Sequence, residues 1–187
     1  MIVPYDPEWP TLFEAERVRL ELALAPWLRG GVHHVGSTAV PGLAAKPIID
    51  MLAAVADLDA ARESFAALGQ LGYAYRVHRP EAHLLVRDGS HHLHLTEPGS
   101  ALWQERLAFR DALCRDPELA GEYECWKASH SGAGGYTESK TPFVARVLAD
   151  RGIELRPDTE RLSASVIATR VRDSVERKKG ARLPSGP

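Results

Sequence analysis

A nearly continuous apolar run, Pro47 to Val55, places the tightest constraint on how this 187-residue chain folds. Its length suits a β-strand, and because it has no polar face, the strand should lie inside a sheet that is covered on both sides. Asp50 is the one charged residue in the run. An unpaired carboxylate among apolar neighbours is costly to bury, so Asp50 should have a metal ion or a basic group as its partner.

The residues before this strand have the outline of a phosphate-binding loop. Gly36 lets a backbone approach a ligand closely, Ser37 adds a hydroxyl and an amide as donors, and Lys46 adds a point charge suited to phosphate. Asp50 follows Ser37 after thirteen residues, and Thr38 is a further candidate donor. Mg²⁺ binds one or two carboxylates together with substrate phosphates, so Asp50 is a candidate metal ligand and catalytic residue. The alternatives are an ordinary Gly-Ser turn and an Asp50 that pairs with Lys46 or an arginine.

His92 and His94 alternate with two leucines on another predicted strand, so both imidazoles should point to one face and the leucines to the core. Together with Asp50 they match a two-histidine, one-carboxylate metal site. They are equally suited to direct contact with a substrate phosphate or base. The third alternative is a polar strand face with a structural role only.

The remaining pattern predicts a mixed sheet followed by an all-helical half, and therefore an α+β fold. Gly30-Gly31 should end the first helix, and Asp88-Gly89 is typical of a tight hairpin turn. We expect helices over residues 10–28, 58–68, 101–115, 118–129 and 140–151, and strands over residues 32–35, 47–55, 73–77, 83–86 and 92–96.

Length and charge predict one domain with a tail. We expect the domain to span residues 1–150, with its sheet part at about 1–98 and its helical part at about 99–150. A basic C-terminal helix or tail should follow over residues 151–187, which hold nine Lys or Arg against five Asp or Glu. This tail is either a solvated end or a contact with a partner.

Net charge, apolar runs and cysteine content limit which partners and which cellular compartment we expect. The net charge of −2 and the lack of an aromatic-basic platform argue against a nucleic-acid binder. No apolar run approaches the ~20 residues of a membrane span. Two cysteines without metal spacing and a start that lacks a signal-peptide pattern predict a cytoplasmic protein.

Taken together, these motifs resemble the GrpB family, a branch of the nucleotidyltransferase superfamily. The resemblance covers most of residues 2–148 and implies a nucleotidyltransferase-like mixed β-sheet flanked by helices, with the helical half as a lid over the site. The matched blocks are the VPYDPEW run at 3–9, the HVGSTAVPGLAAKPIID run at 34–50, HLH at 92–94, FRD at 109–111, Tyr123 with Lys127, and Tyr136 with Lys140 and Phe143.

The superfamily pattern is a Gly-Ser pair, a spacer, and then two acids separated by one apolar residue. Gly36, Ser37 and Asp50 match it, but the second acid falls on Leu52. The resemblance therefore implies a nucleotide site that lacks one metal-bridging carboxylate, which should make nucleotidyl transfer slow or absent.

Several residues are candidates to complete such a site. Glu81, Glu97 or the histidine face at 92 and 94 could substitute for the missing acid. The resemblance also implies phosphate contacts from the helical half, where Lys127 follows Tyr123 by four residues and should lie beside it. These lid candidates are Arg110, Lys127, Tyr136 and Lys140.

Three functions follow from these observations. The first is an enzyme that transfers a nucleotidyl group from a nucleoside triphosphate with Mg²⁺. The second is a non-catalytic nucleotide-binding accessory module, which the fusion of GrpB-like domains to dephospho-CoA kinase in some bacteria links to coenzyme A synthesis. The third is a metal-dependent hydrolase built on Asp50, His92 and His94. In each case the ligand is a nucleotide or another phosphorylated small molecule.

Overall fold

The computed structural model describes residues 1–76, 79–130 and 141–154 and has the α+β architecture expected from the sequence. Its five-stranded sheet has the order β1-β2-β5-β4-β3. β2 pairs antiparallel with β1 and parallel with β5, so the apolar run is an interior strand, as expected. The strands are β1 (Leu28–Val35), β2 (Ile49–Val55), β3 (Ala74–Arg76), β4 (Ala82–Arg87) and β5 (His91–Thr96).

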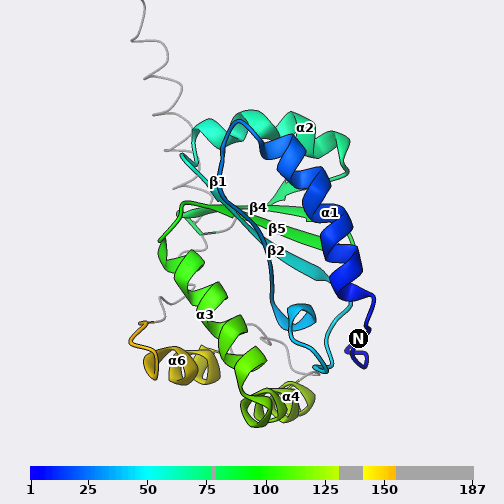
Figure 1. Ribbon diagram of the computed structural model, residues 1–187, viewed down its shortest axis with the longest axis vertical. Helices are drawn as coiled ribbons and strands as arrows, with labels where there is room; N and C mark the ends of the chain where they lie inside the picture. The colour runs from blue at the N-terminus through cyan, green and yellow to red at the C-terminus, as the bar shows by residue number, and fades with distance from the viewer. Residues whose placement is uncertain (77–78, 131–140, 155–187) are drawn as a thin grey trace, which may run out of the picture.

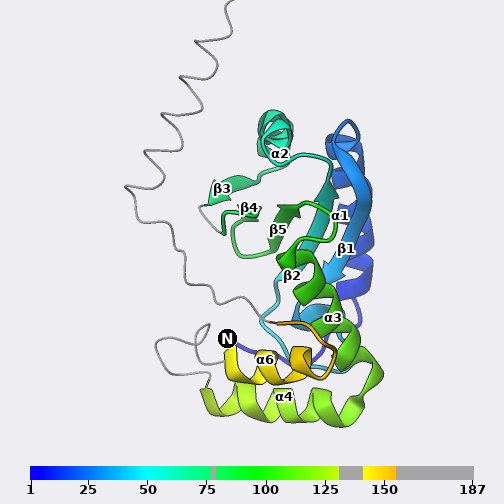
Figure 2. The same ribbon diagram turned by 90° about the vertical axis from the view of Figure 1, so that its left-hand side faces the viewer.

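Helices cover both faces of this sheet. Figure 1 shows the sheet between α1 (Trp9–Leu24) and α3 (Ala101–Arg115). α2 (Phe65–Gln70) lies at one end of the molecule, and α4 (Pro117–His130) and α6 (Thr141–Ala149) lie side by side at the other end, next to α3 (Figures 1 and 2). None of the described helices is both long enough and apolar enough to cross a membrane.

The strand pattern divides the core between the two faces. On the α1 face, Met51 and Ala53 of β2 pack with Leu93 and Leu95 of β5, so the prediction that these two leucines serve the core is confirmed. On the α3 face, Val35, Leu52 and Ala82 pack with Leu102. A third cluster joins the loop between β1 and β2 to the helical half through Val40, Leu43, Leu113 and Tyr123.

The expected end of the first helix is wrong. α1 ends at Leu24, and Gly30 and Gly31 lie inside β1 rather than after a helix. A Cβ on Gly30 would lie 2.7 Å from the Cβ of Ala54, and Gly31 has a φ of +76°. The two glycines therefore permit a close, irregular pairing of β1 with β2.

The helix expected over residues 58–68 is also different. A 3₁₀ helix, η2 (Ala60–Ser64), is followed by the short helix α2, with a buried Ser64 hydroxyl donating to the carbonyl of Ala61. A serine that bonds to its own backbone competes with regular helix formation, which accounts for the tight turn before α2.

The other elements agree with the sequence to within a few residues. α3 has the expected bounds, and Arg87 pairs with His91 across the hairpin turn predicted at Asp88-Gly89. The last predicted helix, 140–151, corresponds to α6, although residue 140 lies outside the described residues. The same is true of residues 155–187, which include most of the predicted basic tail.

Candidate functional site

Asp50 and His92 form a pair where the end of β1 meets the starts of β2 and β5. The register places Val35, Asp50 and His92 side by side across three strands. Nδ1 of His92 lies 3.1 Å from Oδ1 of Asp50, and the two side chains are 34% and 25% exposed. The pair shares the α3 face with Leu52. Among the described residues, His92 is therefore a basic partner of the kind that a carboxylate in this strand requires.

Gly36 closes this site from the β1 side. Its φ of +73° is a conformation that side chains disfavour, and a Cβ there would lie 2.5 Å from Oδ2 of Asp50. The close approach that the sequence predicted for Gly36 is thus an approach to Asp50. Ser37 follows as the first residue of η1 (Ser37–Ala39) and is half-buried. We call Gly36, Ser37, Asp50 and His92 the Asp50 site.

Two polar groups of the Asp50 site are uncommitted. Oδ2 of Asp50 makes no hydrogen bond or ion pair with any residue in the described part of the chain, because the contact with His92 uses Oδ1. The Ser37 hydroxyl likewise has no hydrogen-bond partner among the described residues. A carboxylate oxygen against Gly36 and the hydroxyl of the next residue are therefore without a partner in the described part of the chain.

Thr38 supports the loop from within. It is buried, and its hydroxyl donates to the carbonyl of Ile48 at 3.0 Å while lying 3.0 Å from Nε2 of His34. The imidazole of His34 stacks on Phe13 with 4.8 Å between the ring centres. Burial lowers the pKa of His34 to about 4, and Arg110 adds to this effect although the nearby carboxylate of Asp50 opposes it. Phosphate contact by the Thr38 hydroxyl, which is occupied here, stays a prediction.

Arg110 connects α3 to the end of β1. Its guanidinium donates to the backbone carbonyl of His34 at 2.9 Å and to Oδ1 of Asp111 at 2.6 and 2.8 Å. The side chain is 23% exposed. Arg110 therefore holds the strand that leads into Gly36, and its predicted contact with phosphate remains open.

Lys127 is buried rather than displayed on a helix surface. Its Nζ donates to the carbonyl of Ala44 and lies 4.9 Å from the ring centre of Tyr123, which confirms that these two residues lie side by side. Burial lowers the pKa of Lys127 to about 8. Oε1 of Glu124 accepts from the amide of Ala44 at 3.3 Å, so α4 holds both polar groups of one loop residue. Two residues later, Lys46 is exposed.

The two glutamates that could substitute for the second acid lie away from Asp50. Leu52 is fully buried on the α3 face, as its apolar side chain requires. Glu81 precedes β4 and pairs with Arg79 at 3.7 Å, whereas the residue of β4 beside His92 is Val86. Glu97 follows β5 and accepts from the amide of Leu58 at 3.4 Å. Both acids lie at the opposite end of the sheet from Asp50, so neither completes an acid pair with it.

Metal binding by the protein alone finds limited support. Among residues 1–76, 79–130 and 141–154, no three His, Cys, Asp or Glu side chains come together as metal ligands. His94, on the same face as His92, is buried at 4% exposure. The predicted three-residue site of a hydrolase is therefore not formed by the described residues. Two lid candidates, Tyr136 and Lys140, lie outside them.

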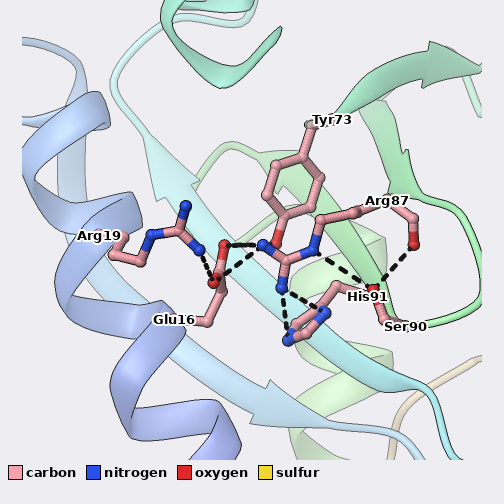
Figure 3. A network of polar contacts seen from close by, with 6 residues as sticks. All are labelled: Glu16, Arg19, Tyr73, Arg87, Ser90 and His91. Atoms are coloured by element: carbon pink, nitrogen blue, oxygen red, sulfur yellow. Dashed lines mark hydrogen bonds and ion pairs between the residues drawn. The ribbon is translucent and has the colours of Figure 1, made fainter. Parts of the chain in front are cut away.

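The sequence did not reveal a second polar cluster, on the α1 face. Figure 3 shows Glu16 of α1 meeting side chains from the sheet. Glu16 is 3% exposed, and its carboxylate accepts from Arg19 at 2.7 Å, the Tyr73 hydroxyl at 3.0 Å and Arg87 at 3.2 Å. Arg87 also donates to Nδ1 of His91 at 2.7 Å. We call Glu16, Arg19, Tyr73, Arg87, Ser90 and His91 the Glu16 cluster.

One signal for the Glu16 cluster was present in the sequence. Phe13, Glu16, Leu20 and Leu24 share the buried face of α1, and the spacing of three and four residues places them on one helical stripe. An acid within an apolar stripe predicts a buried carboxylate with partners. No such pattern indicates the Asp50–His92 pair, because it depends on which strands become neighbours.

Comparisons with known proteins place the chain in a family and agree with this fold. The sequence profile of the family described as "GrpB protein" matches residues 1–150. A UPF0157 protein of Streptomyces coelicolor is 35% identical over 159 residues, which cover 81% of this chain and 84% of that protein. The glutamate-rich protein GrpB of Alkalihalophilus pseudofirmus is 29% identical over 163 residues, which cover 79% of this chain and 93% of that protein.

A solved structure and a larger enzyme extend the comparison. The crystal structure of the conserved protein GrpB from Enterococcus faecalis superimposes with a TM-score of 0.72 at 27% identity, covering 80% of this chain and 96% of that one. A dephospho-CoA kinase of Mycolicibacterium paratuberculosis is 38% identical over 116 residues, which span 57% of this chain but 27% of the enzyme.

Proposed function

The chain belongs to the GrpB family, and on that premise we propose that the Asp50 site binds the phosphate groups of a nucleotide or another phosphorylated small molecule together with Mg²⁺. One observation carries the proposal. Oδ2 of Asp50 lies against Gly36, and Ser37 follows Gly36 in the chain; both residues are partly exposed, and neither Oδ2 nor the Ser37 hydroxyl has a hydrogen-bond partner among the described residues. Groups with that combination are suited to a polar ligand rather than to the core.

Each group has a separate role in this proposal. The Ser37 hydroxyl donates to a phosphate oxygen, and the missing Cβ of Gly36 lets the ligand and Asp50 share a narrow space. Lys46, exposed on the same loop, supplies positive charge. His92 holds Oδ1 of Asp50 and leaves Oδ2 for the ligand.

The Asp50 site can hold Mg²⁺ only together with phosphate oxygens of the bound ligand. Mg²⁺ prefers oxygen ligands and commonly rests on one carboxylate, substrate phosphates and water. Asp50 supplies one such carboxylate, and no group of three potential ligands is present in the described residues. When bound, the ion would neutralise charge on phosphoryl oxygens. Asp50 would orient the phosphate–metal unit.

A further question is whether the Asp50 site also catalyses nucleotidyl transfer once a nucleotide is bound. A two-metal displacement requires carboxylates that bridge both ions, and the position where the superfamily places the second acid is the fully buried Leu52. We therefore expect transfer to be slow or absent, even where binding occurs. Labelled ATP incubated with candidate acceptors, with pyrophosphate release as the readout, measures it. Brisk turnover that Asp50→Ala abolishes would contradict this expectation.

A second candidate function is a nucleotide-binding accessory module without transfer activity. Two observations favour it: the buried Leu52, and the similarity of 116 residues to part of a dephospho-CoA kinase. In this alternative the Asp50 site binds a ligand related to coenzyme A synthesis. Binding of dephospho-coenzyme A without any transfer would favour it over the enzyme.

Calorimetric titration tests the binding proposal directly. The ligands are ATP, GTP, CTP, UTP and dephospho-coenzyme A with Mg²⁺, and inorganic phosphate alone. We expect Ser37→Ala and Asp50→Asn to raise the dissociation constant by about tenfold or more, the equivalent of one lost charge-assisted hydrogen bond. Ser129→Ala is the matched control, because the Ser129 hydroxyl bonds back to its own helix at 2.9 and 3.1 Å. Absence of binding by every ligand would overturn the proposal.

A further inference from the structure

We infer that Thr38 and His34 are positioning residues for the Asp50 site, holding the turn at Gly36 against Asp50 through a directed hydrogen-bond chain. This inference rests on the proposed function, because it assigns a purpose to the position of that turn. Neither residue reaches the uncommitted groups of the site. Both act through Gly36 and Ser37, which lie between them in the chain.

The direction of the chain follows from its donors and acceptors. The carbonyl of Ile48 only accepts, so the Thr38 hydroxyl must give its hydrogen to it at 3.0 Å. The lone pair of that hydroxyl then accepts from Nε2 of His34 at 3.0 Å, which fixes the neutral tautomer with hydrogen on Nε2. A neutral ring is also the form that suits burial and stacking on Phe13.

The chain joins the two segments that form the site. His34 lies near the end of β1, Thr38 lies in η1, and Ile48 immediately precedes β2. The turn's own backbone bonds, from Ala39 to Gly36 and from Val40 to Ser37, are longer, at 3.3 and 3.2 Å. Thr38 therefore adds a side-chain link between the turn and the residue that precedes β2, beside the bond of 2.9 Å from Arg110 to the carbonyl of His34. It holds Ser37 at a fixed distance from the strand that presents Asp50.

The far end of the same loop has a separate anchor. There Glu124 and Lys127 of α4 hold Ala44, and the backbone of Ala45 pairs with Val3. Removal of the Thr38 hydroxyl should therefore loosen Gly36 and Ser37 without releasing the whole loop. This separation makes Thr38 the residue at which positioning can be tested without dismantling the fold.

Two substitutions break the chain and two serve as controls. Thr38→Val keeps the shape but removes the hydroxyl, and His34→Phe keeps the ring that stacks on Phe13 but removes the donor. Thr38→Ser retains the hydroxyl. Tyr73→Phe removes a different buried hydroxyl, 3.0 Å from Glu16 in the Glu16 cluster, and so controls for general loss of stability.

Titration with ATP and Mg²⁺, at a temperature where melting curves show all proteins folded, gives the first readout. We expect Thr38→Val to weaken binding by about tenfold, His34→Phe by less, and Thr38→Ser and Tyr73→Phe by under about twofold. Recovery of binding in Thr38→Ser distinguishes positioning from a packing defect. Equal binding by all the folded variants would overturn the inference.

Amide spectra of the ligand-free proteins give the second readout. Thr38→Val should shift the signals of Gly36, Ser37 and Asp50 and speed hydrogen exchange at the turn, whereas Tyr73→Phe should leave these signals in place. If the parent protein binds no phosphate ligand, the proposed function fails and the spectra still decide whether the chain holds the turn. Unchanged turn signals in Thr38→Val would overturn the inference on their own.

Discussion

The Glu16 cluster and the Asp50 site lie on opposite faces of the same sheet. Their carboxylates differ in exposure and in the number of groups that bind them. His91 and His92 are neighbours in β5, so their side chains point to opposite faces of the sheet. On the α1 face, Glu16 is 3% exposed and accepts from three donors. On the α3 face, the Asp50 side chain is 25% exposed and its described partner is His92.

This difference separates a carboxylate that is fully engaged within the protein from one that keeps an oxygen for the proposed ligand. A buried carboxylate whose lone pairs are all engaged leaves nothing for a ligand, and breaking its network leaves uncompensated charge. A half-exposed carboxylate with one free oxygen loses little stability when its charge is removed. Residue type alone does not distinguish the two, since both regions combine an acid with a histidine.

The largest effect should come from the Glu16 cluster. Glu16→Gln removes the charge that Arg87 faces across the core, so we expect the free energy of unfolding to fall by roughly 3 kcal/mol or more, with ligand binding unchanged in the folded fraction. Urea denaturation measures it. Glu14→Gln, on the exposed side of α1 beside Arg17, is the matched control and should change little. An equal fall in the free energy of unfolding for Glu16→Gln and Glu14→Gln would contradict a structural role for the Glu16 cluster.

The second-largest effect should be a loss of stability at acidic pH, which comes from His91 of the Glu16 cluster. Burial, reinforced by Arg87, lowers the pKa of His91 to about 4 from its ordinary 6.5. Between pH 4 and 6.5 the unfolded chain therefore binds more protons than the folded protein. The stabilisation that neutral His91 contributes is complete above pH 6.5 and is lost as the pH falls towards 4. The loss approaches roughly 3 kcal/mol. Urea denaturation at pH 7, 5.5 and 4 should show a shallower decline in His91→Gln, while an identical decline would exclude His91 as its source.

An intermediate effect should come from the turn at Gly36 in the Asp50 site. Gly36→Ala combines an unfavourable φ of +73° with a Cβ only 2.5 Å from Oδ2 of Asp50, so we expect a loss of roughly 2 to 3 kcal/mol together with loss of ligand binding. Gly42→Ala, with a φ of +79° and open space around its Cβ, should lose only about 1 kcal/mol and bind normally. Melting curves and titration with ATP and Mg²⁺ compare them. Equal behaviour would show that contact with Asp50 is unimportant.

The smallest effect on stability should come from Asp50 itself. Asp50→Asn keeps the shape and a contact with His92, so we expect the free energy of unfolding to change by less than about 1 kcal/mol. Binding of ATP with Mg²⁺ should weaken by about tenfold or more, because the amide lacks the charge that a metal requires. A melt and a titration on one sample give both values. A large loss of stability with unchanged binding would make Asp50 structural.

Much of the fold was predictable from local patterns. The apolar run around Asp50 predicted an interior strand, and the alternation at 92–95 predicted which side chains serve the core. α3 was predicted to the residue, since its serine N-cap and apolar stripe are local signals. The end of the first helix was misplaced because Gly30 and Gly31 look like a helix end, whereas both lie in β1, with Gly30 close against Ala54 across the sheet.

The candidate site was predicted only in part. Gly36, Ser37 and Asp50 were identified by spacing, and the structure places Gly36, with Ser37 next in the chain, against Asp50. Lys127 was expected to contact phosphate from the helical half, which stays a prediction; the structure buries it and directs its amine to the carbonyl of Ala44. A lysine beside a tyrosine on a helix looks the same in sequence whether the pair faces solvent or the core.

By itself, the sequence determined that an acid lies in an interior strand after a glycine-serine loop, and that this acid must have a partner. These conclusions depend on hydrophobic patterning and on the cost of burying charge, which are properties of short segments. Only the tertiary structure decided that the partner is His92 and that Glu16 is fully engaged while Asp50 is not. The physical reason is that hydrogen bonds join atoms about 3 Å apart, and only the register of β2 with β5 brings residues 42 positions apart to that distance.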